Sequence, residues 1–374
     1  MRTKFYVFAV FMAICLTAGA QDLHFSQYYA SPLTLNPALT GKFDGFARIG
    51  GIYRGQYYGL SQTGSIFRTP AISADFSLLK DKWLEGNALG VGLSVVNDQQ
   101  TSTATDGSGG VGKINTTSIS LNLAYTIQLM RTHPMQISIG FEPSVTMKNT
   151  SGNYEYPQAF NSQLVYQTGS PYNESFTQPK RTYFNLAYGL FFNHKPIDML
   201  TYFLGFAMNN VTRPQTDIIS INNSVGQLNF LYILHGGLEI KVANKWTIIP
   251  GFLYQSEAKA NEANAGITAG YDVLDRDDKN GVRQKATIFF GLWNRMGNDV
   301  GSAFQYRNIT PKIGLDYKGF RVDFAYDISV GNIATDAHPV PGIYRPQAYE
   351  LAVSYIFGGP KGLRERNFLF NPRY

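Results

Sequence analysis

Apolar and polar residues alternate with a period of two along most of the chain. From Ser118 to Leu129 every odd position is apolar, whereas the even positions are small or polar. From Phe320 to Ser329 the apolar residues take the even positions instead, and charged or small residues take the odd ones. Such alternation predicts strands with one apolar and one polar face. No later stretch has the roughly 18 consecutive apolar residues of a spanning helix, so the pattern predicts an all-β chain.

Fourteen segments carry this alternation. They cover residues 43–54, 67–80, 87–97, 114–130, 134–148, 181–194, 200–211, 228–242, 245–257, 262–275, 283–295, 303–317, 320–331 and 347–357. The odd-numbered connections hold 12, 16, 32, 16, 4, 7 and 15 residues, and the even-numbered ones hold 6, 3, 5, 2, 7 and 2. Bacterial outer-membrane barrels have long outer loops and short periplasmic turns. We therefore predict a transmembrane antiparallel β-barrel of about 14 strands over residues 43–357, with both termini in the periplasm. Connections nine to eleven are too similar in length to exclude an error of two strands.

Charges on the polar faces separate a membrane barrel from a soluble β-sandwich, whose strands also alternate. The predicted polar faces carry Asp75, Glu142, Glu239, Asp272, Asp316 and Asp327, together with Lys241, Lys312 and Arg321. A dry core does not accept so many ionised groups, but a water-filled lumen does. The inward residues are otherwise mostly Ser, Thr, Gly and Asn. We therefore predict a polar, wet lumen.

Composition supports a membrane barrel. Charged residues make up 16% of the chain, against roughly 25% in an average soluble protein. Aromatic residues reach 14%, with 24 Tyr and 26 Phe, and the hydrophobic fraction is 44%. These values exclude a disordered chain, and they suit a barrel whose apolar outer face is bordered by aromatic girdles.

Residues 1–20 have the pattern of a secretory signal peptide. Arg2 and Lys4 precede the apolar run from Phe5 to Thr17, and Ala18-Gly19-Ala20 is a small-residue cleavage site. The single Cys15 lies in the apolar run, so the mature chain is expected to contain no cysteine. Loss of Arg2 and Lys4 lowers the formal charge from +6 to +4. The remaining excess is spread along the chain, and no basic cluster indicates nucleic-acid binding.

Two segments flank the barrel. Residues 21–42 contain two prolines, which oppose regular strand, and too many aromatic and leucine residues for a free tail. They are either a plug packed in or under the barrel or a periplasmic segment that docks another protein. Residues 358–374 form a periplasmic C-terminal tail that combines basic and aromatic residues. This tail either binds a partner or closes the periplasmic mouth.

Three stretches form a recognisable set. They are Phe25-Ser26-Gln27-Tyr28-Tyr29 with Pro32-Leu33, Leu35-Asn36-Pro37-Ala38 and Gly41, then Pro311 to Val322 with Tyr326-Asp327, and finally Asn371-Pro372-Arg373-Tyr374. Together they resemble one family, the PorP/SprF outer-membrane proteins of the type IX secretion system in Bacteroidota. Many members have Cys where this chain has Asn371, so no role of that cysteine transfers. The resemblance implies a barrel of about this size and a role in exporting secreted proteins, gliding adhesins included, or in holding them at the cell surface.

The partners implied are the C-terminal sorting domain of a secreted protein and, further, periplasmic or other components of the secretion system, with outer-membrane lipid around the barrel. Outer loops are expected at 98–113, 149–180, 212–227 and 332–346. Aromatic residues crowd the 149–180 loop, which either contacts a protein or glycan or folds over the barrel mouth. The candidate partner contacts are Phe25, Gln27, Tyr28, Tyr29, Asn36, Pro37, Arg373, Tyr374, Tyr154, Tyr156, Tyr166 and Tyr172.

Catalytic chemistry is not expected. The five histidines, His24, His133, His194, His235 and His338, show no metal-ligand spacing, and no G-x-S-x-G motif occurs. Asp275 to Gly281 does not complete a calcium loop, and Gly107 to Gly110 lacks a strand-to-helix context for phosphate. We predict a protein that is not an enzyme and needs no cofactor or metal.

A transporter is the alternative function. Fourteen strands can enclose a polar diffusion pore or, as in FadL-like transporters, an apolar ligand. A carrier of hydrophobic compounds needs a continuous apolar lumen, which the predicted inward residues do not supply. A polar diffusion porin fits them better, but it leaves both terminal segments unexplained.

Overall fold

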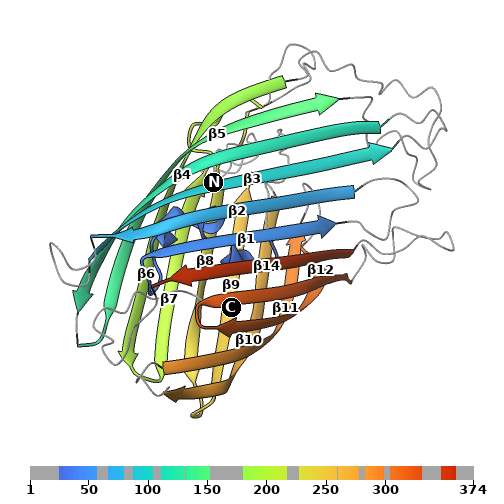
Figure 1. The fold of residues 1–374 in the computed structure, drawn as a ribbon. Helices are drawn as coiled ribbons and strands as arrows, with labels where there is room; N and C mark the ends of the chain where they lie inside the picture. The colour runs from blue at the N-terminus through green and yellow to red at the C-terminus, as the bar shows by residue number, and fades with distance from the viewer. Residues whose placement is uncertain are drawn as a thin grey trace, which may run out of the picture.

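The computed structural model describes residues 25–56, 66–79, 87–103, 111–130, 132–151, 180–216, 227–258, 260–277, 283–298, 304–330 and 347–358. Within these ranges, fourteen antiparallel strands close into one barrel (Figure 1). Every strand pairs with its neighbours in sequence, and β14 closes the barrel by pairing with β1. The predicted fold class and strand count are therefore confirmed.

The strands follow the predicted segments closely. They are β1 (Ala47–Gln56), β2 (Ile66–Leu78), β3 (Ala88–Thr103), β4 (Val111–Met130), β5 (Met135–Ser151), β6 (Lys180–Ile197), β7 (Leu200–Asn209), β8 (Leu231–Lys241), β9 (Trp246–Glu257), β10 (Ala260–Asp277), β11 (Arg283–Asn298), β12 (Gln305–Tyr317), β13 (Phe320–Ser329) and β14 (Gln347–Phe357). One difference is that β3 and β4 extend into the loop predicted at 98–113. Polar side chains there still pair across strands, as Thr69 of β2 does with Asp98 of β3, so the loss of apolar alternation does not end the ladder.

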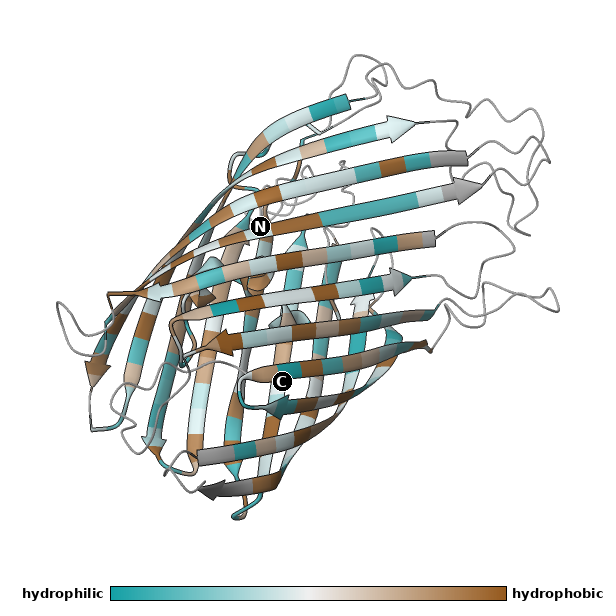
Figure 2. Ribbon diagram, in the orientation of Figure 1, coloured by the Kyte–Doolittle hydropathy of each residue, from teal (hydrophilic) through white to brown (hydrophobic). Residues whose placement is uncertain are grey.

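The alternation places apolar side chains on the outside of the barrel. Leu121 of β4 is 43% exposed and its neighbour Asn122 is 0% exposed. The same contrast holds in β13, where Phe324 is exposed and Ala325 is buried. Figure 2 shows the resulting hydrophobic and hydrophilic bands along the strands. An apolar outer face is what a lipid bilayer requires of a spanning barrel.

Exposed aromatic side chains cluster toward both ends of the strands. Those near the ends joined by even-numbered connections include Phe46, Tyr202, Trp246, Phe320 and Phe357, and those near the opposite ends include Tyr232, Tyr254 and Tyr306. Aromatic girdles of this kind mark the two interfaces of a membrane. They bracket the apolar band of the barrel wall.

The two ends of the barrel differ in their connections. The even-numbered connections lie at one end, here called the short-turn end, and the odd-numbered ones lie at the long-loop end. Lys318 and Gly319, which join β12 to β13, both have positive φ, as a two-residue type I′ turn requires. Within the described part of the chain, no helix is long and apolar enough to cross a membrane.

Residues 25–42, here called the plug, lie inside the barrel (Figure 1). They contain the short helices η1 (Tyr28–Ala30), α2 (Pro32–Leu35) and η2 (Pro37–Leu39). The chain enters the wall at the short-turn end, where the Phe46 N–H donates to the Phe357 carbonyl. Phe25 lies further toward the long-loop end, since the N–H of the next residue, Ser26, donates to Glu350 near the start of β14. The plug therefore runs along the lumen from one end toward the other.

The core of the molecule lies between the plug and half of the barrel wall. Tyr28, Tyr29, Leu35, Ala38 and Leu39 of the plug form a single buried cluster with wall residues of β6–β9 and β11. The wall residues are Phe191, Phe203, Ala207, Leu231, Ile233, Ile249, Leu253, Phe289 and Trp293. The expectation of a mostly polar, wet lumen is thus wrong for this side, because apolar inward residues that looked scattered in sequence converge on the plug.

Candidate functional site

Inward-facing glycines form a seat for the Asn-Pro-Ala turn of the plug. A Cβ atom on Gly140 of β5 would lie 2.2 Å from the Ala38 nitrogen, and one on Gly189 of β6 would lie 2.0 Å from Asn36 Oδ1. Gly140 pairs directly with Gly189 in the sheet, so the two bare positions are adjacent. Side chains at either position are excluded, and the plug backbone lies directly on the wall.

Asn36 is the polar centre of this seat. Its side-chain nitrogen donates to the carbonyls of Leu190 (3.0 Å) and Phe206 (3.3 Å) and lies 3.0 Å from His235 Nε2. Its Oδ1 accepts from the Ala38 N–H. Since an amide nitrogen only donates, Nε2 is the acceptor, and Nδ1 carries the hydrogen given to the Tyr29 hydroxyl 2.8 Å away. The chain Asn36–His235–Tyr29 thus ties the plug to β8.

Replacing Asn36 with alanine is expected to destabilise the folded barrel by about 3 kcal/mol. The change removes the donor to the buried His235 Nε2 and two donations to wall carbonyls, and a buried polar group left without a partner costs about 1–3 kcal/mol. Urea titration of the detergent-folded protein, followed by tryptophan fluorescence, measures the loss. Thr34→Ala is the matched control, because Thr34 bonds only to Ser31 within the plug and should change stability by about 1 kcal/mol or less. Equal effects of the two variants would contradict an anchoring role for Asn36.

Polar contacts hold the plug near the short-turn end. Asp75 of β2 accepts from the Gly41 N–H (2.8 Å) and forms a two-bond ion pair with Arg48 of β1. The buried Lys42 ammonium donates to Gln136 Oε1 at 2.9 Å and lies over the Phe191 ring. Burial lowers the pKa of Lys42 to about 7. This end of the plug is therefore bound to β1, β2, β5 and β6.

A buried charge cluster holds the other end of the plug. Arg54 of β1 pairs with Asp327 of β13 at 2.9 Å and with Glu350 of β14, and these three side chains are 1–3% exposed. The Ser26 and Gln27 N–H groups donate to the two Glu350 carboxylate oxygens at 2.6 and 2.7 Å. The sequence analysis predicted that water would surround the lumen carboxylates Asp75 and Asp327. The structure shows that this prediction is wrong for both. They are buried in ion pairs that the alternation alone did not reveal.

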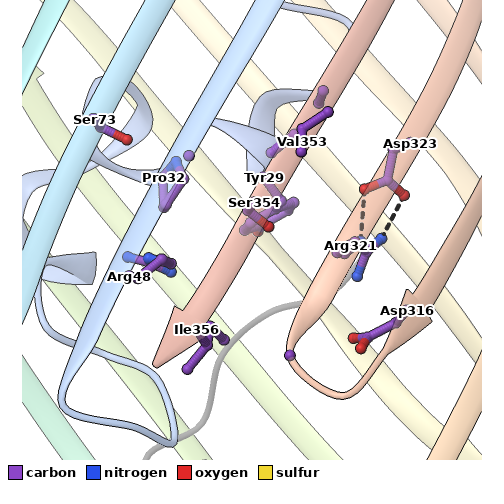
Figure 3. A pocket seen from close by; sticks show the side chains of 14 residues that line it. Tyr29, Pro32, Arg48, Ser73, Asp316, Arg321, Asp323, Val353, Ser354 and Ile356 are labelled. Carbon is purple, nitrogen blue, oxygen red and sulfur yellow. Dashed lines mark hydrogen bonds and ion pairs between the residues drawn. The ribbon is translucent and has the colours of Figure 1, made fainter. Parts of the chain in front are cut away.

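A crevice remains between the plug and the wall formed by β1, β2 and β12–β14 (Figure 3). It has about 680 Å³ of open space, part of it continuous with solvent, and it reaches Gly319 and Ile356 at the short-turn end. Its charged lining is neutralised in place, because Arg321 binds both oxygens of Asp323 at 2.6 and 2.9 Å. The crevice is thus lined by ion pairs as well as by apolar residues such as Val353 and Ile356.

The structure places six of the twelve candidate partner contacts. Phe25, Gln27, Tyr28, Tyr29, Asn36 and Pro37 are all buried in the lumen against the barrel wall. Arg373, Tyr374, Tyr154, Tyr156, Tyr166 and Tyr172 lie outside the described residues. In this conformation the six plug residues bind the protein's own wall, so a partner reaches them only if the plug moves.

Sequence reasoning missed the wall residues that receive the plug. In the sequence Gly140 and Gly189 are only two of many small residues in the strands, and the spacing of His235 indicated no partner for it. Arg54, Asp327 and Glu350 carried a usable signal: all three sit on inward positions near the same ends of β1, β13 and β14. Barrel closure pairs Arg54 directly with Glu350, which makes those charges neighbours.

The potential metal ligands in the described part of the chain are dispersed or already engaged in other contacts. There, no group of three or more His, Cys, Asp or Glu side chains is arranged to hold a metal ion. His235 is occupied by Tyr29 and Asn36, and His194 contacts Tyr202. Residues Asp275–Asp277, from the calcium-loop-like stretch, belong to β10. The site is an assembly of plug and wall contacts.

Solved structures with a similar fold include channels and transporters of hydrocarbons. A deletion mutant of the monoaromatic hydrocarbon channel TodX aligns at 10% identity and a TM-score of 0.50, covering 87% of this chain and 92% of that one. The toluene transporter TbuX of Ralstonia pickettii aligns at 10% identity and a TM-score of 0.48, covering 91% of this chain and 96% of that one. A FadL homologue of Pseudomonas aeruginosa aligns at 12% identity and a TM-score of 0.46, covering 86% of this chain and 93% of that one. At such low identity the likeness concerns the fold alone.

No curated protein sequence matches the chain. The family model described as "Type IX secretion system membrane protein PorP/SprF" matches residues 17–355. That range includes the plug and all but the last two residues of β14.

Proposed function

The chain belongs to the PorP/SprF family of type IX secretion system membrane proteins, and from this premise we propose that it serves the export or surface attachment of a particular secreted protein, such as a gliding adhesin. This is a family of secretion-system membrane proteins and not of enzymes. The family match over residues 17–355 is the observation that carries the proposal. Binding of the cargo's C-terminal domain is the proposed mechanism.

The plug supports a binding role over a conducting one. With Asn36 seated on the wall and Ser26 held at the charge cluster, the plug occupies the lumen along much of its length and is not arranged as an open conduit. Cargo contacts are therefore proposed at the ends of the barrel. The aromatic loop at 149–180 and the basic, aromatic tail at 358–374 are the proposed surfaces, with the tail facing the periplasm.

The transporter alternatives have weaker support. A polar diffusion porin needs an open lumen, whereas residues 25–42 occupy this one. A carrier of hydrophobic compounds needs an apolar path, whereas the crevice is lined by the ion pairs of Arg48 and Arg321. The fold likeness to hydrocarbon channels does not extend to their ligands.

Loss of this protein is expected to remove one secreted protein from the cell surface and leave other type IX cargo in place. The measurement compares surface-shaved peptides from a strain lacking the protein with those from the same strain complemented by the wild-type chain. Purification of the wild-type protein from its outer membrane in mild detergent should recover that same cargo through its C-terminal domain. An unchanged surface proteome, with a barrel that purifies alone and conducts ions steadily, would support the porin instead.

A further inference from the structure

The long-loop end of the lumen contains a pocket that the wall builds by itself. Its polar part is Arg54, Asp327 and Glu350, which pair with one another, with Thr310 donating to Asp327 Oδ1 at 2.7 Å. Its apolar part is Ile52, Ala71 and Ala352. We call these seven residues the N-terminal pocket. Since the polar contacts join wall residues to each other, they do not depend on the plug being present.

Residues Phe25–Gln27 occupy this pocket in the manner of a bound peptide. The two successive N–H groups of Ser26 and Gln27 donate to the two oxygens of one carboxylate, Glu350. The Ser26 hydroxyl donates to Asp327 Oδ2 at 2.7 Å, and the Gln27 amide donates to the Glu350 carbonyl at 3.2 Å. The Phe25 ring fills the apolar part of the pocket.

The groups recognised are those that many peptides present. They are an aromatic side chain, two consecutive main-chain N–H groups and a small hydroxyl, a mode in which backbone contacts give affinity and a pocket gives specificity. After the expected cleavage, only residues 21–24 precede Phe25, so this end can leave its pocket without moving a loop. The Asn36 seat, ten residues further along, holds the rest of the plug meanwhile.

A second observation marks this end of the plug as incompletely satisfied. The Tyr28 hydroxyl directly follows the occupied segment, is buried, and has no hydrogen-bond partner among the described residues. A buried hydroxyl without a partner costs free energy. One buried hydroxyl beside the pocket is therefore unsatisfied, whereas at the Asn36 seat each side-chain polar atom of Asn36 has a partner.

We propose that the N-terminal pocket is a peptide-binding site that exchanges its own residues Phe25–Gln27 for a segment of the secreted partner. The incoming segment carries an aromatic residue followed by a serine or threonine and two free main-chain N–H groups. It approaches from the long-loop end, toward which the pocket lies. The exchange rests on the proposed function, because it assigns the partner's docking site to the lumen.

The test uses a full-length chain whose own segment cannot fill the pocket. Ser26→Pro removes one N–H and the hydroxyl while leaving the wall unchanged. A fluorescent peptide of residues 25–31 is added to this variant and to the wild type in detergent, and binding is read by anisotropy. We expect the variant to bind the peptide at least tenfold more tightly, because the wild-type site is filled by a tethered competitor.

Two controls make the binding result specific. A peptide carrying proline at the position of Ser26 should bind neither protein, and adding Glu350→Gln to the Ser26→Pro chain should abolish binding of the natural peptide. Equal binding to wild type and variant, or equal binding of the proline peptide, would overturn the proposal. This readout needs no secreted partner, so it can fail while the export phenotype of the deletion strain stands, and the reverse.

Exchange itself is tested by crosslinking. The mature chain is expected to have no cysteine, so Phe25→Cys with Ala352→Cys provides a unique thiol pair for a short bismaleimide. Crosslinked cells should lose at least tenfold of the partner from their surface, whereas the single-cysteine variants treated alike should keep it. Normal display of the partner on crosslinked cells would overturn exchange.

Discussion

Alanine in place of Gly140 or Gly189 is expected to lift the Asn-Pro-Ala turn off the barrel wall and destabilise the protein by about 3 kcal/mol, the upper end of the usual overpacking range. The new Cβ would lie 2.2 Å from the Ala38 nitrogen in one case and 2.0 Å from Asn36 Oδ1 in the other. Neither group can move away easily. The Ala38 nitrogen is part of the backbone, and the Asn36 side-chain amide is held by four hydrogen-bond partners.

The lumen offers a matched control for this prediction. Gly50 of β1 also faces the lumen, but a Cβ there meets no atom closer than 3.7 Å. Gly50→Ala should therefore leave stability unchanged or raise it slightly, since alanine restricts the unfolded chain. Urea midpoints and single-channel conductance should be measured together. Gly140→Ala should lower the midpoint and produce conductance, and behaviour identical to Gly50→Ala would show that the seat does not hold the plug.

Replacing Arg54 with methionine is expected to cost about 3–5 kcal/mol and to release the first residues of the plug. Arg54 neutralises both Asp327 and Glu350, which are 2% and 1% exposed, and its loss leaves two buried carboxylates side by side. Breaking a buried ion pair by removing one partner carries a penalty of this size. Arg295 lies 3.9 Å from Asp327 and offsets part of the loss.

The exposed pair of Lys195 and Asp198 supplies the control for Arg54→Met. Its N–O distance is 3.0 Å, close to the 2.9 Å between Arg54 and Asp327, but Asp198 is 97% exposed. Asp198→Asn should leave stability essentially unchanged, because ion pairs exposed to water contribute little to folding. Restoring neutrality in Arg54→Met with Asp327→Asn and Glu350→Gln should recover a large part of the loss. If the triple variant is no more stable than Arg54→Met, buried charge is not the cause.

Much of the barrel could be predicted from sequence because its signals are local. Alternation between neighbouring positions in β4 and β13 shows which side chains face lipid, whatever the partner strands are. Strand ends follow from turns such as Lys318-Gly319. The plug segment stood out for a similar reason, since Phe25, Tyr28 and Tyr29 are too apolar for a free tail.

The contacts between plug and wall were not accessible in the same way. In the sequence, an inward glycine such as Gly140 or Gly189 indicates only a small residue. The structure shows that the absence of a side chain at these positions lets the plug backbone lie against the wall. Alternation does not show that the inward Phe203 and Leu253 converge, whereas in the structure both meet one side of the plug.

The sequence by itself determined the strands, their outward and inward faces, and the family signature, because each depends on residues within a few positions of one another. Tertiary structure alone decided that Ser26 meets Glu350, 324 positions away, and that Asp327 is neutralised by Arg54. Those contacts require a closed barrel with the N-terminal segment threaded along its lumen. A periodic pattern states which way a side chain points, whereas closure decides what it meets there.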